Sequence, residues 1–263
     1  EVQTVVNSLT KKIINKQIIG YNSLWNKVCY NRFSDIDKSI KNNIVKKVFR
    51  IGKHIVIEVD STYLIFHLRM TGYLYYSRII PQNKKHLRCY FTFSDNSYLL
   101  FEDIRKFGGF YFYNDLIPLK NKIGMDPFDT NFTFDWLKNN IINNRSTIKS
   151  LLLNQKFICG LGNIYIDEVL WLSKIKPSKI AKNISNIKIE ILHTSIIEVL
   201  KESISFHGTT IKNFKFDNMK TGNYKDKLNV YGRKGMKCKR CEQSLITTIK
   251  ISGRTTHFCS KCQ

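Results

Sequence analysis

The chain ends in two Cys-x2-Cys pairs, Cys238/Cys241 and Cys259/Cys262, with 17 residues between the pairs. Four thiolates in two close pairs form the tetrahedral sulfur shell that a structural zinc ion prefers, and a short β-ribbon brings such pairs together. Two disulfides, or four unrelated thiols, are the alternatives. We predict that residues 226–263 form a zinc ribbon that binds one structural Zn²⁺ ion.

Basic residues surround these cysteines: Lys237, Lys239, Arg240, Lys250, Arg254 and Lys261. The whole chain has 43 Lys and Arg against 20 Asp and Glu, a formal net charge of +23. Such an excess favours a polyanionic partner, either nucleic acid or an anionic membrane surface, although a merely solvated basic surface is the alternative. Together with the predicted ribbon, the positive charge indicates that the partner is a nucleic acid.

The compartment follows from what the sequence lacks. No stretch approaches the roughly 20 apolar residues of a membrane span, and no secretory signal is present. The other three cysteines, Cys29, Cys89 and Cys159, are scattered along the chain, which suits buried thiols in a reducing compartment. We therefore expect no membrane association and a cytoplasmic location.

The pattern of apolar residues changes near residue 130. Before it, apolar and polar residues alternate, as at Ile55, Ile57 and Val59, and similar runs follow at 63–68, 73–76, 87–93 and 98–101. This alternation predicts a small antiparallel sandwich or barrel. Beyond residue 130 helical spacing takes over. We predict an α+β multidomain protein with domains at 1–125, 126–225 and 226–263.

Two helices are expected in the second domain. Apolar residues recur at helical spacing from Ile189 to Val199 behind Ser185, a candidate N-cap, and residues 164–171 read as another helix. At the other end of the chain, Val2, Val5 and Leu9 belong to an amphipathic stripe that already includes Glu1. Since no N-cap residue precedes this stripe, we expect further residues upstream of Glu1.

Several motifs, in this order, resemble the formamidopyrimidine-DNA glycosylase family: residues 1–5, Gly52-Lys53, 67–72, 103–108, 160–165 with Asp167-Glu168, 231–235, and the ribbon ending at Cys262-Gln263. The resemblance covers essentially the whole chain. It implies an N-terminal β-sandwich, a helix–two-turn–helix domain and a C-terminal zinc ribbon. These are the parts that the residue patterns predict.

The chain departs from the family pattern in two places. Mature family members begin Pro-Glu-Leu-Pro-Glu-Val, and this sequence begins at the second Glu of that motif, Glu1. The proline, whose secondary amine attacks C1′ of the damaged nucleotide, is expected upstream. The ribbon also has about one residue more than usual between its cysteine pairs, and Glu242 replaces a small residue.

The resemblance implies catalytic roles for three residues. Lys53 matches the lysine that contacts the lesion and its phosphate and donates a proton in β-elimination. Arg254 matches the ribbon arginine that holds the phosphates, a task suited to a fork-shaped guanidinium. Without the resemblance, both would read as surface charges. Glu168 matches an acid buried near the terminal proline, and a purely structural carboxylate is an equally good interpretation.

Other residues match the family's DNA contacts. Met70, Arg105 and Phe107 correspond to the three side chains that replace the damaged nucleotide in the duplex, where an apolar wedge restores stacking and an arginine bonds the orphaned cytosine. Met70 and Phe107 would otherwise read as core. Asn163, behind Gly160 and Gly162, matches a phosphate clamp at a helix N-terminus. His86 and Arg145 are looser matches to further DNA contacts. Thr209, Thr210 and Lys212 precede a loop that is expected to close on the flipped base, and Lys212 is expected to contact DNA.

We therefore expect a bifunctional DNA glycosylase/AP lyase that removes oxidised purines from duplex DNA and cleaves the abasic site by β,δ-elimination. The implied partner is double-stranded DNA with an oxidised purine or an abasic site, bound by a monomer associated with the bacterial nucleoid. Two alternatives remain. One is a non-catalytic protein that binds damaged DNA, and the other is an oxidised-pyrimidine glycosylase of the endonuclease VIII type.

Overall fold

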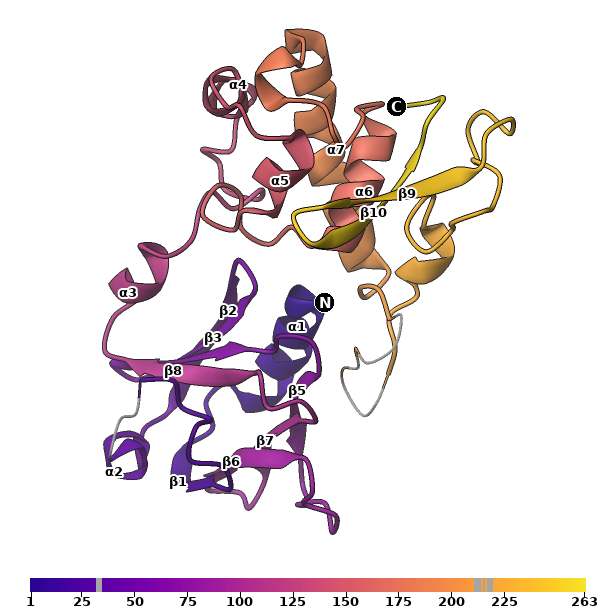
Figure 1. The fold of residues 1–263 in the computed structure, drawn as a ribbon. Helices are drawn as coiled ribbons and strands as arrows, with labels where there is room; N and C mark the ends of the chain where they lie inside the picture. Colours follow the sequence, from indigo (N-terminus) through magenta and orange to yellow (C-terminus); the bar gives the residue numbers. More distant parts are fainter. Residues whose placement is uncertain (32–34, 211–213, 215, 217–219) are drawn as a thin grey trace. The chain divides into compact units, whose positions relative to one another are not determined.

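A computed structural model describes residues 1–31, 35–210, 214, 216 and 220–263 of the chain (Figure 1). The chain forms two compact units, each with its own hydrophobic contacts. The first unit joins residues 1–121 to the later segment 206–223, and the second joins residues 122–205 to residues 224–263. The segment 206–223 therefore belongs with the N-terminal unit, and the cysteine-rich end belongs with the helices.

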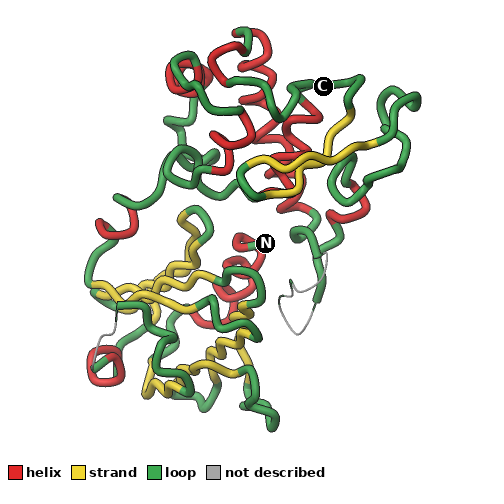
Figure 2. The backbone as a smooth tube through the Cα atoms, in the orientation of Figure 1, coloured by secondary structure: helices red, strands yellow, loops and turns green. Residues whose placement is uncertain are grey.

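The first unit is built on two four-stranded antiparallel sheets, whose strands Figure 2 shows in yellow. One sheet has the order β1-β6-β7-β5 and consists of β1 (Ile18–Ser23), β6 (Leu87–Phe93), β7 (Tyr98–Asp103) and β5 (Gly72–Ser77). The other has the order β2-β3-β4-β8 and consists of β2 (Val45–Ile51), β3 (His54–Val59), β4 (Thr62–His67) and β8 (Gly109–Tyr113). Of the two folds that the alternating pattern predicts, a sandwich or a barrel, the two separate sheets form the sandwich.

Aromatic rings fill the centre of this sandwich. Phe66 on β4 lies within 5.1–6.1 Å, centroid to centroid, of Phe91, Phe101 and Phe110 from both sheets. Successive side chains of a strand point to opposite faces, so alternate positions of β4, β6, β7 and β8 supply these rings. Burial of such large rings supplies much of the hydrophobic stabilisation of the unit.

Helix α1 (Val2–Ile13) packs on this sandwich through the predicted stripe, with Val5, Val6, Leu9 and Ile13 buried. Its N-cap residue, Glu1, makes no side-chain capping bond. Two short helices, α2 (Ile36–Ile40) and α3 (Ile117–Lys120), lie in the connections of the same unit.

The segment 206–223 packs on the sandwich although it follows a helix of the second unit. Thr209 and Asn223 form an antiparallel bridge, and Phe216 joins the hydrophobic core around α1. A Cβ atom at Gly208 would lie 3.1 Å from the backbone of Glu1. The N-terminal end of α1 therefore lies directly against this segment.

The second unit contains four α-helices: α4 (Phe134–Ile141), α5 (Ile148–Leu153), α6 (Asn163–Leu172) and α7 (Asn186–Ser205). Threonine side chains cap two of them, since the hydroxyl of Thr133 accepts from the Trp136 amide and that of Thr147 from the Ser150 amide. Among the described residues, no helix is both long enough and apolar enough to cross a membrane. Both predicted helices are present, α6 with one extra residue at each end.

Helix α6 is the centre of the second unit, because every residue from Tyr165 to Trp171 is buried. That run includes two carboxylates, Asp167 and Glu168, which require partners in such an environment. Strand β10 (Arg254–Cys259) packs against α6 and pairs with β9 (Ile246–Ile251). The intervening turn places Ser252 and Gly253 at φ of 48° and 71°, the left-handed geometry of a two-residue hairpin turn.

Candidate functional sites

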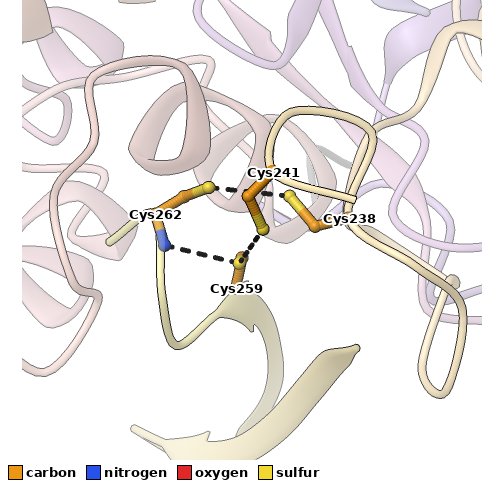
Figure 3. Close-up of side chains that lie close together, drawn as sticks. All are labelled: Cys238, Cys241, Cys259 and Cys262. Atoms are coloured by element: carbon orange, nitrogen blue, oxygen red, sulfur yellow. Dashed lines mark hydrogen bonds between the residues drawn. The ribbon is translucent and has the colours of Figure 1, made fainter. Parts of the chain in front are cut away.

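The four ribbon cysteines converge on one point, with all four sulfur atoms within 4.8 Å of one another (Figure 3). The Sγ atoms of Cys238 and Cys262 are 3.8 Å apart, and so are those of Cys241 and Cys259. A regular tetrahedron with zinc–sulfur bonds of about 2.3 Å has edges of about 3.8 Å, whereas a disulfide needs sulfur atoms about 2.05 Å apart. The geometry fits one structural Zn²⁺ ion and excludes the two-disulfide alternative.

The surroundings of Cys238 favour the thiolate that zinc requires. Burial opposes ionisation, but the backbone N–H groups of Cys241 and Arg240, the indole N–H of Trp171 and the Cys259 thiol together lower the pKa of Cys238 to about 6. Two of the basic residues predicted to face a polyanion bond carbonyl groups within the unit instead. The Nζ of Lys239 donates to Leu228 O at 2.9 Å, and the Nη1 of Arg240 donates to Trp171 O at 2.9 Å.

Lys53 lies in the tight turn between β2 and β3. Gly52, at a φ of 55°, supplies the left-handed conformation, and Ile51 pairs with His54 directly across the turn. Gly52 O accepts from Arg50 Nη1 at 2.9 Å, which fixes the base of the turn. The lysine is therefore held at one end of the sandwich, at the tip of two paired strands.

Two histidines lie beside this lysine, and their roles were not anticipated from the sequence. His54 on β3 and His67 on β4 are cross-strand partners whose rings meet edge to face with centroids 4.7 Å apart. Burial lowers the pKa of His54 to about 4. Burial, His54, Arg69 and Lys53 together lower the pKa of His67 to about 3. Both rings are neutral near pH 7, and His67 Nδ1 accepts the Arg69 amide at 3.0 Å, which leaves the proton on Nε2.

Met70, Arg105 and Phe107 come together at the surface of the same unit, although the first and the last are 37 positions apart in the sequence. Met70 is 60% exposed and Phe107 54% exposed, so neither belongs to the core. The Nη1 of Arg105 lies 3.0 Å from Met70 Sδ, and its guanidinium carbon lies 4.5 Å from the Phe107 ring centroid. Two large apolar side chains and a cation thus form one exposed cluster.

A buried carboxylate, Asp103, holds the loop that carries this cluster. One oxygen, Oδ2, accepts from the amides of Phe107 at 2.8 Å and Gly108 at 2.7 Å. The other, Oδ1, accepts from the Arg105 amide at 3.1 Å and the Thr71 hydroxyl. Asp103 begins the 103–108 motif, and a carboxylate followed by a Gly-containing turn is a sequence signal for such an anchor. A further bond, from Tyr30 Oη to Phe107 O at 2.8 Å, braces the loop from outside.

Glu168 is 1% exposed, and each of its carboxylate oxygens accepts two hydrogen bonds. Its Oε2 accepts from the backbone and side-chain nitrogens of Asn229 at 2.8 and 3.1 Å, and its Oε1 accepts from the Val230 and Tyr231 amides at 2.9 Å each. This arrangement favours the structural interpretation of Glu168, because no lone pair on either oxygen is left for a reacting group. The carboxylate fixes the turn that leads into the ribbon.

The neighbouring carboxylate, Asp167, has partners that the sequence did not reveal. It forms a fully buried ion pair with Lys149 and accepts from the His257 amide at 2.8 Å. Burial lowers the pKa of Lys149, while the charge of Asp167 raises it and that of Arg254 lowers it further. Asp167 and its partners thus connect α6 to α5 and to β10, the strand that begins with Arg254.

The remaining predicted residues lie at several places. Arg254 is exposed at the start of β10. Asn163 opens α6 and donates from Nδ2 to Thr255 O at 3.0 Å. Arg145 is exposed in the loop before α5. His86 lies beside the loop of residues 103–108, because its backbone carbonyl accepts the Asp103 amide at 2.9 Å. Lys212 lies outside the described residues.

Three family models match the chain in the order of these parts. The formamidopyrimidine-DNA glycosylase N-terminal domain matches residues 1–110, the H2TH domain of the same glycosylase matches residues 123–215, and the zinc finger found in FPG and IleRS matches residues 235–263. A β-sandwich, a helical domain and a four-cysteine zinc ribbon in this order define a class of three-part DNA glycosylases.

Similar proteins of known family identify the member of this class that the chain resembles. The formamidopyrimidine-DNA glycosylase of Lactococcus lactis subsp. lactis is 36% identical over 270 residues, covering 100% of this chain and 97% of the relative. That of Mycoplasma genitalium is 35% identical over 268 residues, covering 100% of this chain and 94% of the relative. The chain belongs to the formamidopyrimidine-DNA glycosylase family.

Solved structures agree with this assignment. A point variant of Lactococcus lactis Fpg in complex with a Fapy-dG-containing DNA superposes with a TM-score of 0.93 at 35% identity, covering 100% of this chain and 98% of that one. A structure of MutM in complex with carbocyclic 8-oxo-G-containing DNA superposes with a TM-score of 0.91 at 36% identity, with the same coverage.

Proposed function

We propose that this chain is a bifunctional DNA glycosylase/AP lyase of base excision repair that removes oxidised purines from duplex DNA and cleaves the resulting abasic site. The observation that carries the proposal is the exposed cluster of Met70, Arg105 and Phe107. Its loop is anchored by a buried carboxylate, so two apolar groups and a cation stay at the surface despite the cost of exposing them. Such a cluster suits the space left in a duplex when a nucleotide is extruded.

In this proposal the apolar side chains of Met70 and Phe107 replace lost stacking, and Arg105 bonds the orphaned base. The likeness to proteins solved with Fapy-dG and 8-oxo-G DNA supports oxidised purines as the substrate class. The net charge of +23 supports a steep dependence of binding on salt. A monomer in the bacterial cytoplasm, associated with the nucleoid, is the assembly and setting we propose.

The lyase chemistry requires an amine, a proton donor and a phosphate ligand. In the family pattern that the sequence resembles, the secondary amine of a terminal proline attacks C1′, expels the base and leaves an iminium ion, which allows elimination at both phosphates. Lys53 is proposed as the proton donor in β-elimination. Arg254 is proposed to hold the phosphates at the lesion, with Asn163, Arg145, His86 and Lys212 as further DNA contacts.

Glu168 is proposed as a positioning residue rather than a proton carrier, because its four hydrogen bonds occupy both oxygens. It keeps the 229–231 turn attached to α6. The zinc ion is proposed to act in the same way. It holds the ribbon in the shape that presents Arg254 and takes no part in the reaction.

Borohydride trapping tests the proposal, because borohydride reduces an iminium ion to a stable protein–DNA crosslink. A chain with Pro-Glu-Leu-Pro placed ahead of Glu1, and with a free terminal proline, is expected to crosslink to a duplex with 8-oxoguanine opposite cytosine and to cut the strand on both sides. The matched control is the chain that begins at Glu1, which lacks the proline amine.

The outcomes separate the three candidate activities. Crosslinking that needs the proline and prefers 8-oxoguanine supports the proposal. A preference for an oxidised pyrimidine would favour the endonuclease VIII type of enzyme. Tight binding to damaged duplex without any crosslink, with Lys53 and Arg254 intact, would favour a non-catalytic binding protein. Efficient crosslinking by the control would make another amine, first of all that of Lys53, the nucleophile.

A further inference from the structure

The indole of Trp171 lies against the four-cysteine centre. Trp171 is the penultimate residue of α6, is 8% exposed, and shares a hydrophobic cluster with Cys238, Cys259, Val230 and Ile246. Its Nε1–H donates to Cys238 Sγ at 3.5 Å. Tryptophan has a single polar hydrogen, and here it is directed at a metal-ligating sulfur.

Arg240, inside the first Cys-x2-Cys pair, covers the same indole. Its guanidinium carbon lies 3.9 Å from the Trp171 ring centroid, close enough for a cation–π interaction. Its Nη1 and Nη2 donate to Trp171 O at 2.9 Å and Leu172 O at 3.4 Å. Those carbonyls are at the C-terminal end of α6, where a positive charge is favourable.

The charge of the centre explains why these contacts matter. Four thiolates and one Zn²⁺ ion carry a net charge of −2, and two of the sulfur ligands, Cys238 and Cys259, belong to residues with 0% exposure. A buried anion of this kind needs N–H donors and nearby cations. The Cys262 amide donates to Cys259 Sγ at 3.4 Å, so backbone groups meet part of this need. Trp171, a residue outside the ribbon, supplies a further N–H donor, to Cys238 Sγ.

We propose that Trp171 is a positioning residue of the zinc centre: its N–H bond to Cys238 and its stacking with Arg240 slow the loss of the metal and bind the first Cys-x2-Cys pair to the end of α6. The opposite end of α6 also bonds the ribbon, through Asn163 Nδ2 and Thr255 O. Helix α6 therefore connects the zinc ligand Cys238 at one end to the hairpin that carries Arg254 at the other. The proposal concerns metal retention and stands apart from the enzymatic activity proposed above.

The test uses the zinc-loaded full chain with Trp171→Phe, which keeps an aromatic ring for Arg240 but removes the N–H donor. Zinc transfer to a chromogenic chelator is expected to be about tenfold faster, which corresponds to an activation barrier lower by about 1.4 kcal/mol. The matched control is Trp136→Phe in α4, which lies on another helix and stacks on Phe157. Its transfer rate is expected to equal that of the unsubstituted chain.

Cobalt(II) gives a spectroscopic readout that a general loss of stability would not reproduce. Removal of a hydrogen bond from a thiolate raises the energy of its lone pair, so the thiolate-to-cobalt charge-transfer band should move to lower energy in Trp171→Phe and stay in place in Trp136→Phe. Unchanged transfer rate and unchanged band in the folded Trp171→Phe chain would overturn the proposal.

If Trp171→Phe does not fold, benzothienylalanine at position 171 replaces it, because this residue is close to tryptophan in size and shape and has a sulfur atom in place of the N–H group. Faster zinc transfer and the band shift support the proposal. Identity with the unsubstituted chain overturns it. Arg240→Lys adds a second arm, since lysine keeps the charge but loses the planar stack. A zinc transfer rate unchanged by this substitution would remove Arg240 from the proposal.

Discussion

At the scale of single residues, Asp103 decides whether the exposed cluster keeps its shape. In Asp103→Asn, an NH₂ group replaces one oxygen and faces N–H donors of the loop. We expect the free energy of unfolding to fall by about 2–4 kcal/mol, because buried donors lose their acceptor. Urea unfolding measures this fall. Affinity for abasic-site DNA should fall as well.

The control for this substitution is Asp115→Asn, where an exposed carboxylate accepts the Ile117 amide at 2.7 Å. We expect a change of less than about 1 kcal/mol there. If both variants are equally stable, then the loop of residues 103–108 is held by other contacts and Asp103 is not its anchor.

The two histidines beside Lys53 make stability depend on pH. The pKa values of His54 and His67 are lowered to about 4 and about 3 in the folded chain, so below about pH 6.5 the unfolded chain binds protons that the folded chain does not. Their contribution to stability is therefore complete above that pH and is lost as pH falls toward 4. Each histidine adds a slope of up to about 1.4 kcal/mol per pH unit.

Urea unfolding between pH 7 and pH 4.5 measures this slope. His54→Phe should show a smaller one, since one of the two depressed groups is absent and the aromatic contact with His67 is kept. NMR titration of the ring protons gives an independent check. Midpoints near 6.5 for both rings in the folded chain would contradict the prediction.

At the scale of elements, α6 organises the second unit through two adjacent buried acids. Glu168 bonds the turn at residues 229–231, and Asp167 bonds Lys149 on α5 and His257 on β10. A helix that is buried on all sides reads from sequence as a plain core helix. Here its two carboxylates connect it to three separate segments.

Glu168→Gln distinguishes a structural carboxylate from a catalytic one. Because an amide cannot accept on both sides, we expect the free energy of unfolding to fall by about 2–4 kcal/mol and zinc to be released more readily. Exposed Glu190 on α7 provides the control as Glu190→Gln, with little change expected. Loss of base excision in single turnovers with unchanged stability would instead make Glu168 a catalytic residue.

At the scale of the whole molecule, the zinc ribbon is too small to fold by hydrophobic burial alone. We expect chelation of the metal to disorder residues from about 230 onward and to weaken binding to abasic-site duplex at least tenfold, because Arg254 loses its fixed position. The slope of log affinity against log salt should become shallower. Elemental analysis and titrations at several salt concentrations measure both effects.

The sandwich provides the internal control for this experiment. Its β-sheet signal in circular dichroism should persist after chelation, since its core contains none of the zinc ligands. Protein purified without stoichiometric zinc, yet with full DNA affinity, would show that the ribbon does not depend on the metal.

The sequence by itself determined the class of fold. Apolar residues at every second position, as at Ile55, Ile57 and Val59, predicted a sandwich or barrel, helical spacing after residue 130 predicted the helices, and two Cys-x2-Cys pairs predicted the zinc site. These patterns succeed because they depend on local geometry, the period of a strand or a helix, or on the ligand preference of one ion. Motifs in a fixed order then predicted a common role for Met70, Arg105 and Phe107, and the structure brings these three side chains together.

Only the tertiary structure decided which polar groups meet. The pairing of His54 with His67, the anchoring of a loop by Asp103, the four bonds to Glu168 and the contact of Trp171 with Cys238 join residues distant in sequence or hidden within a regular pattern. Buried polar groups take whatever partner the fold brings to them, and periodicity does not record that choice. The same reason explains why segment 206–223 packs with the sandwich, since its attachment depends on Phe216 and Gly208 rather than on its loop-like composition.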